Sequence, residues 1–198
     1  MIKTITIISI LTIMLASCSS DKEQKNEILQ NFEWQADRFA DLAIMRHQVP
    51  GFANLSVQQK TLVYYLHEAA LCGRDILYDQ NYKYNLCIKR TFESIYTNYS
   101  GDRATEEWKN LTIFLKEIWF SNGIHHVYST DKLKPRFSED YFRGVLAEIQ
   151  DSLLPLDKGE SRTAFEEKII PIIFDPEVDA KRVNLDPEVD NIEASANN

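Results

Sequence analysis

Apolar residues recur three and four positions apart along most of this chain, which is the spacing of one face of a helix. Turn-forming pairs separate these segments at Pro50-Gly51, Gly101-Asp102 and Asn122-Gly123. No segment alternates convincingly between apolar and polar residues, so we expect a mainly α, multi-helix domain. The pattern predicts helices over about 25–46, 56–78, 85–99, 105–121, 138–154 and 162–174.

Each of the first four helices has an apolar face that we expect to enter the core. Ser56 and Gln59 stand in the positions of a capping box at the start of the second helix. Pro171 strains the last helix, because proline removes a backbone donor. The four faces are Phe32, Phe39, Leu42 and Ala43; Leu62, Leu66, Ala69, Gly73 and Ile76; Ile88, Phe92, Ile95 and Tyr99; and Trp108, Leu111, Phe114, Leu115, Ile118 and Trp119.

The N-terminal residues have the features of a secretory signal rather than of a folded element. Lys3 precedes an apolar run over 5–15, and small residues lead to Cys18. The run has eleven residues, whereas a membrane-spanning helix needs roughly 20. The ending Leu-Ala-Ser-Cys is similar to a bacterial lipoprotein signal, in which Cys18 is lipidated; a plain signal peptide or an uncleaved anchor is the alternative.

This interpretation gives a domain organisation and a location. We expect a signal peptide over 1–17, a tether over 18–27, a helical domain over 28–174 and an irregular acidic tail over 175–198. Acyl chains on Cys18 would hold the protein on a membrane surface. Serines rather than acidic residues follow this cysteine, which favours the outer membrane of the bacterial cell envelope.

Charge and cysteine content exclude some classes of function. The formal net charge is −8, and the sequence contains no basic patch, so we do not expect a nucleic-acid partner. The tail repeats Asp-Pro-Glu-Val-Asp at 175–179 and 186–190, and two copies are too few for a solenoid. A disulfide between Cys72 and Cys87 is disfavoured, because they lie at different heights of two antiparallel helices.

His67-Glu68, followed by Cys72, is similar to half of a zinc-peptidase helix. Such a helix places two histidines at positions i and i+4, but the residue at i+4 from His67 is Leu71. Cys72, five positions after His67, lies about 140° round the helix from it. We interpret Cys72 as a small buried residue. A metal site that combines His67, Cys72 and one histidine of the His125-His126 pair is a minor alternative.

The loop after the fourth predicted helix, "WFSNGIHHVYSTDK", concentrates groups that bind ligands. It contains two imidazoles, a phenol, an amide and several hydroxyls next to a flexible Asn-Gly pair. Loops held by rigid helices often carry binding residues. A polar turn whose aromatic residues pack on the core fits the same pattern, and the residues alone do not separate the two.

Three stretches together resemble the N-terminal part of bacterial dipeptidyl-peptidase III, a family of two-lobed α+β zinc exopeptidases that release dipeptides from the N-terminus of short peptides. The resemblance extends over about 32–198. The stretches are "QVPGFANLSVQQKTLVYYLHEAALCGRDILYDQNYKYNL" at 48–86, "GDRATEEWKNL" at 101–111 and "IWFSNGIHHVYSTDKLKPRFS" at 118–138.

The resemblance implies that the chain contributes part of a peptide-binding cleft without catalysing hydrolysis. The family holds its zinc with a His-Glu-x-x-Gly-His motif, which does not occur in this sequence, so we expect no metal or other cofactor and no activity of the chain alone. The candidate residues for binding the N-terminal end of a short peptide are Ser121, Asn122, Gly123, His125, His126 and Tyr128.

The chain ends at "EASANN" without a helix cap. We therefore expect the first quarter or third of such an enzyme, ended by a premature stop or a split gene, and a second chain with the zinc motif would complement it. The alternative is a stand-alone helical surface lipoprotein that acts as a binding or interaction module.

Overall fold

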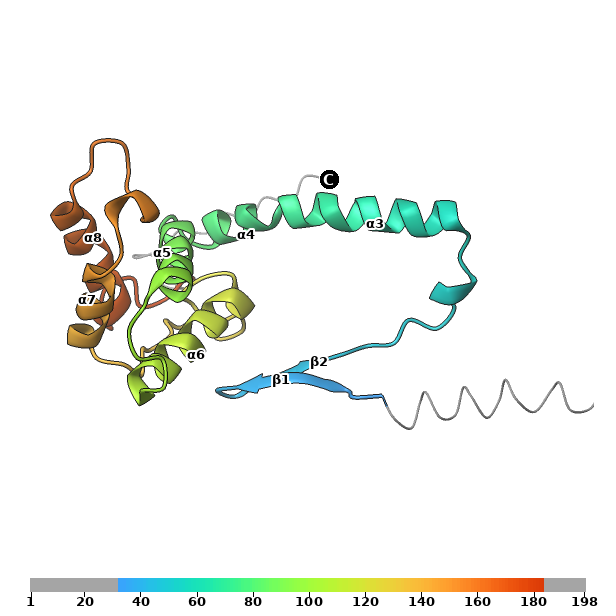
Figure 1. Ribbon diagram of the computed structural model, residues 1–198, viewed down its shortest axis with the longest axis horizontal. Coiled ribbons are helices and arrows are strands. Elements are labelled where there is room, and N and C mark those ends of the chain that lie inside the picture. The colour runs from blue at the N-terminus through green and yellow to red at the C-terminus, as the bar shows by residue number, and fades with distance from the viewer. Residues whose placement is uncertain (1–31, 184–198) are drawn as a thin grey trace, which may run out of the picture. The chain divides into compact units, whose positions relative to one another are not determined.

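The computed structural model describes residues 32–183, a mainly helical domain with a small two-stranded hairpin (Figure 1). These residues fall into two compact units, 32–50 and 51–183. The predicted signal peptide, lipidation site and tether, and the second Asp-Pro-Glu-Val-Asp copy, lie outside the described residues. Within 32–183 no helix has the length and apolar character needed to cross a membrane.

The prediction of a helix over 25–46 is wrong for the residues that the structure describes. Strands β1 (Gln35–Phe39) and β2 (Leu42–Met45) form an antiparallel hairpin in which Phe39 pairs with Leu42. Ala40 turns the chain with a φ of 48°. Asp37, Phe39, Leu42 and Ile44 are half-buried while their neighbours are exposed, so the period is two. The segment is too short for this alternation to be distinguished from a helical face.

The capping box at Ser56 is confirmed. After the turn at Gly51 and a 3-10 helix, η1 (Phe52–Asn54), helix α3 runs over Val57–Cys72. The backbone N–H of Ser56 donates to Gln59 Oε1 at 2.9 Å, and the N–H of Gln59 donates to Ser56 Oγ at 3.2 Å. Two backbone donors of the first turn are therefore satisfied reciprocally.

The predicted helix over 56–78 is divided in two at Gly73. Helix α4 (Arg74–Asn81) begins directly after this glycine and extends three residues further than expected. The N–H of Gly73 donates to Ala70 O at 3.2 Å, three residues back, so the α-helical pattern is interrupted here. Glycine permits the interruption because it has the least preference of any non-proline residue for a helix interior.

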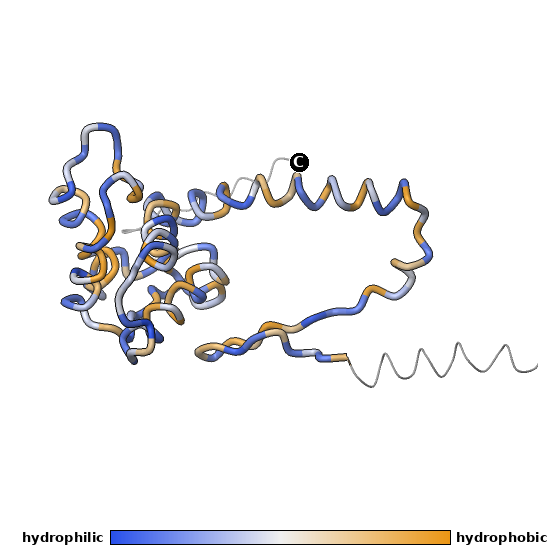
Figure 2. The backbone as a smooth tube through the Cα atoms, in the orientation of Figure 1, coloured by the Kyte–Doolittle hydropathy of each residue, from blue (hydrophilic) through white to orange (hydrophobic). Residues whose placement is uncertain are grey.

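Helix α3 does not bury its apolar face. None of its residues is buried, and Leu62 and Leu66 are 59% and 60% exposed. Ile76 of the same predicted face lies in α4 and is 58% exposed. Apolar residues recur along this uncovered helix (Figure 2). The prediction that Cys72 is buried is wrong: it is exposed, on a helix that buries none of its residues. Exposed apolar stripes of this kind are common at interaction surfaces.

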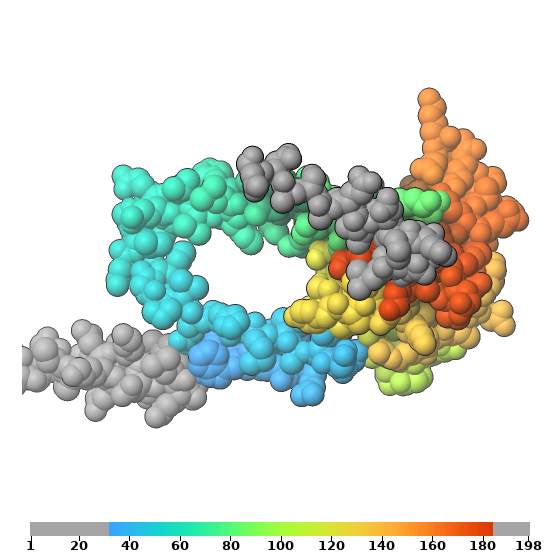
Figure 3. Space-filling view, turned by 180° about the vertical axis from the view of Figure 1, so that it is seen from behind, coloured from blue at the N-terminus to red at the C-terminus, as the bar shows by residue number. Residues whose placement is uncertain are grey.

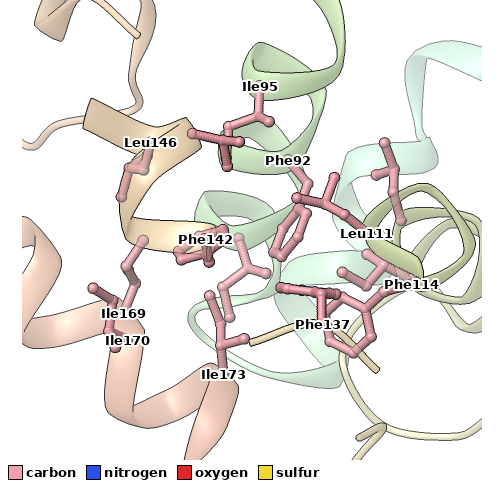
Figure 4. Close-up of a cluster of buried hydrophobic side chains, with 14 of the residues drawn as sticks. Phe92, Ile95, Leu111, Phe114, Phe137, Phe142, Leu146, Ile169, Ile170 and Ile173 are labelled. Carbon is pink, nitrogen blue, oxygen red and sulfur yellow. The ribbon is translucent and has the colours of Figure 1, made fainter. Parts of the chain in front are cut away.

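The core lies among the remaining helices, α5 (Asn85–Asn98), α6 (Glu106–Ser121), α7 (Glu139–Ala147) and α8 (Arg162–Phe174). Their start positions confirm the predictions, with Thr105, Ser138 and Ser161 as N-caps. Four phenylalanine rings meet at the centre of this core (Figure 4). Its labelled members are Phe92, Ile95, Leu111, Phe114, Phe137, Phe142, Leu146, Ile169, Ile170 and Ile173.

Helix α7 ends earlier than the predicted position near residue 154, and a separate 3-10 helix, η2 (Asp151–Leu153), follows it. The guanidinium group of Arg162, at the start of α8, donates to Leu146 O and to Ile149 O. Leu146 lies in the last turn of α7 and Ile149 lies two residues beyond its end, where carbonyls lack the donors of a continuing helix. A long-range contact that the local pattern does not contain therefore fixes this boundary.

Candidate functional site

The six predicted binding residues lie together at the end of α6 and in the loop that follows it. Ser121 is the last residue of α6, and Asn122 ends the helix in the left-handed conformation with a φ of 52°. Gly123 follows with a φ of 146°. These two conformations turn the chain sharply, as expected for an Asn-Gly pair at a helix C-terminus.

Two asparagine side chains from another part of the chain hold this turn. Asn85, at the start of α5, is buried; it donates from Nδ2 to Tyr78 O at 3.2 Å and to Asn122 O at 3.4 Å, and its Oδ1 accepts from Ile124 N at 3.0 Å. Asn81 donates to Asn122 O at 3.2 Å. We call this the asparagine clamp. The sequence analysis missed it, because its residues lie in an ordinary polar linker.

The candidate residues divide by exposure into a buried and an accessible group. Ser121, Gly123 and His125 are buried, so they shape the loop from inside. Asn122 and His126 are half-buried, and Tyr128 is 81% exposed. Only the second group can contact a ligand in solution.

His125 makes structural contacts inside the protein and does not face solvent. Its Nε2 lies 2.8 Å from Asp179 O, and its ring meets the ring of Tyr82 edge-on at a centroid distance of 5.4 Å. Its Nδ1 is buried and has no hydrogen-bond partner among residues 32–183. Burial lowers the pKa of His125 below its ordinary value, with a further lowering from the nearby cations Lys132 and Arg182.

His126 holds the tip of the loop in shape. Its Nδ1 accepts from the backbone N–H groups of Tyr128 at 3.3 Å and Ser129 at 3.2 Å. A ring nitrogen that accepts carries no proton, so the neutral ring has its proton on Nε2. His126 is half-buried, and its ring lies 5.9 Å from that of Tyr128 between centroids. Together they present an imidazole and a phenol at the loop tip.

A cavity of about 590 Å³ lies beside this loop, between the residues after its tip and the end of α8. Its volume is in the range of small-ligand pockets. None of the six predicted residues lines it, and the sequence carries no signal for it because its two walls are about 40 residues apart. The lining residues are Asp131, Lys132, Leu133, Lys134, Pro135, Ile173, Phe174, Pro176, Glu177 and Ala180.

The described residues do not fit a zinc site. Over 32–183 no three His, Cys, Asp or Glu side chains gather in a way that would hold a metal ion. His67 and Cys72 are exposed on α3, and the Nε2 of His125 is engaged with Asp179. The minor metal alternative is therefore not supported by the geometry. Cys72 and Cys87 are both free thiols.

Comparison with known proteins leaves the site to be interpreted on its own geometry. No protein-family model matches this chain, and no curated protein matches it.

Proposed function

We propose that this chain forms one lobe of a dipeptidyl-peptidase III-like protein, and that the loop after α6 supplies part of the cleft for the N-terminal end of a short peptide. The asparagine clamp is the observation that carries the proposal. It joins two of the resembling stretches, because Asn81 and Asn85 belong to "DQNYKYNL" and Asn122 belongs to "FSNG". Residues far apart in the chain thus build one turn.

The chemistry of the loop tip suits this role. His126 and Tyr128 offer an imidazole and a phenol to solvent, and Asn122 offers a half-buried amide. Polar groups of this kind orient a peptide by hydrogen bonding, while rigid buried neighbours fix their positions. Hydrolysis would require a zinc-activated water, whose ligands this sequence does not contain. A second polypeptide segment carrying the zinc motif is therefore the expected partner.

The exposed apolar face of α3 and α4 supports the proposal that this lobe packs against another polypeptide segment. Leu62 and Leu66 on α3 and Leu77 on α4 are 59%, 60% and 49% exposed. We further propose that lipidation of Cys18 anchors the protein to the outer membrane. Both features suit an envelope protein that presents a peptide-binding lobe.

The proposal predicts binding of peptides with a free N-terminus. The purified full chain should bind a pentapeptide labelled at its C-terminus more tightly than the N-acetylated form, as measured by fluorescence anisotropy. Replacing Tyr128 by alanine should raise the Kd by about tenfold, because an exposed aromatic contact is lost. Tyr64→Ala, at a 57% exposed tyrosine on α3, is the matched control and should leave the Kd unchanged.

No saturable binding, or equal losses in the two tyrosine variants, would contradict the proposal. In the same samples we expect no dipeptide release from a chromogenic reporter with added zinc. Turnover that a chelator abolishes would show that the chain hydrolyses peptides by itself.

A further prediction concerns the apolar stripe. Replacing Leu62 and Leu66 together by serine should lower the fluorescence of a hydrophobic dye and reduce self-association, with a change in the free energy of unfolding of less than about 0.5 kcal/mol per site. Thr61→Ser, on the same exposed helix, is the control. A large loss of stability in the double variant would show that these leucines are buried in solution.

A stand-alone helical module is the second candidate function, and the closed core of α5–α8 favours it. Buried residues from all four helices contact one another there without any contribution from α3. This candidate predicts a single sharp thermal transition with little dye binding. The peptidase-like lobe instead predicts dye binding before the transition.

A further inference from the structure

The segment 175–182, which follows α8, is attached along the loop after α6; we call it the strap. Figure 3 shows residues of this region (red) beside the loop (yellow). Two backbone hydrogen bonds join them, from Lys132 N to Ala180 O and from Arg182 N to Thr130 O, both at 2.9 Å. Lys181 also pairs with Asp131 at 3.3 Å. The strap carries three of the residues that line the cavity: Pro176, Glu177 and Ala180.

Asp179 is the point at which side chains from other elements hold the strap. It adopts a φ of 49°, a left-handed conformation that, apart from glycine, Asn and Asp adopt more readily than most residues. His125 contacts its carbonyl oxygen through Nε2 at 2.8 Å. The hydroxyl of Tyr82, between α4 and α5, donates to its carboxylate. Asp179 is therefore fixed at both its backbone and its side chain.

The contact with Asp179 defines the protonation state of His125. A carbonyl oxygen only accepts, so Nε2 must carry the proton in the neutral ring. Nδ1 is then an acceptor, and it is buried without a donor in the part of the chain that the structure describes. Protonation would place a second N–H in this site with no acceptor for it, and a buried donor without an acceptor is costly.

The charges around the ring oppose protonation as well. Burial lowers the pKa of His125 most, and the cations Lys132 across the loop and Arg182 in the strap lower it further. The backbone contact and the carboxylate of Asp179 raise it, but the net shift is downward. The carboxylate of Asp179 already accepts the hydrogen bond of Tyr82, whose pKa is raised by burial and by this contact. When the strap leaves, the ring becomes solvated and both of its N–H groups find water.

We propose that His125 and Tyr82 latch the strap to the loop by holding Asp179, and that protonation of His125 releases it. The latch is a separate property from peptide binding and does not depend on it. Its release would remove one wall of the 590 Å³ cavity, so mild acid would widen the opening of this cavity.

The direction of the pH dependence of strap docking follows from the direction of the pKa shift of His125. The pKa of His125 is lower in the docked state than its ordinary value of 6.5. Docking is therefore fully stabilised above about pH 6.5, and this contribution is lost as the pH falls below that value. When the strap is open, His125 is expected to have its ordinary pKa. The equilibrium constant for strap opening should then be up to about tenfold larger at pH 5.5 than at pH 7.5.

Hydrogen–deuterium exchange of the full chain at pH 7.5 and 5.5, corrected for intrinsic rates, tests this latch. The amides of Lys132 and Arg182 report it, because they donate across the strap. We expect their protection to fall by about threefold to tenfold at pH 5.5, while the amides of α6 keep theirs. Unchanged protection of the two reporting amides in the wild-type chain would overturn the proposal.

Three variants separate the latch from a general effect of acid. In His125→Gln, the amide keeps a donor for Asp179 O but does not titrate, so strap protection should be equal at the two pH values. His67→Gln, at an exposed histidine on α3, should behave as wild type. If His125→Gln does not fold, Tyr82→Phe serves instead: opening should rise at both pH values with the acid dependence retained. Acid dependence that persists in His125→Gln would refute the role of this histidine.

Discussion

Replacing Phe92 by alanine should lower the free energy of unfolding by about 3–5 kcal/mol. The Phe92 side chain is fully buried, and its ring lies 5.2 Å from that of Phe142 and 5.4 Å from that of Phe114 between centroids. The substitution removes apolar area and leaves a cavity between α5, α6 and α7 that these helices fill only in part. Chemical denaturation followed by far-UV circular dichroism measures the loss.

Phe52→Ala is the matched control for this change of residue type. Phe52 lies in η1 and is 45% exposed. The centroid of its ring lies 5.8 Å from the ammonium nitrogen of Lys60. Its truncation should cost less than about 1 kcal/mol. Similar losses in the two variants would mean that the core is not centred on the phenylalanine cluster.

Gly123→Ala should destabilise the loop after α6 by about 2–4 kcal/mol. At this position a Cβ atom would lie 2.6 Å from Oδ1 of Asn85 and closer still to the rest of its amide group. The φ of 146° is itself unfavourable for alanine. Asn85 would have to withdraw, and its hydrogen bonds to Tyr78, Asn122 and Ile124 would be lost in a buried environment.

Gly159→Ala separates the backbone effect from the steric one. Gly159 also has a positive φ, of 84°, but a Cβ there would meet no atom within 4 Å. Its replacement should cost only the backbone strain, about 1–2 kcal/mol. The unfolding free energies of the two variants, together with peptide binding by Gly123→Ala, test the clamp. Equal losses in the two variants would show that the asparagine clamp adds nothing.

The helices of the core were predictable because their signals are local. Ser138 and Ser161 each bind a backbone N–H three residues ahead, and the stripe of Ile88, Phe92 and Ile95 has the period of its own helix. The hairpin at 35–45 was missed, because Phe39 and Leu42 are three positions apart, which fits one face of a helix as well as a pair across a tight turn. The end of α7 was missed because Arg162, sixteen residues beyond Leu146, determines it.

In the candidate site, too, local features were predictable from the sequence and long-range contacts were not. The sequence alone determined that the Asn-Gly turn ends α6 and that imidazole and phenol groups follow it, because helix C-caps and residue chemistry are local properties. Only the tertiary structure decided which groups are accessible. It buried His125 against Asp179, left Tyr128 in solvent, and left the apolar face of α3 without cover. Burial depends on residues that are distant in the chain, so the spacing of apolar and polar residues cannot specify it.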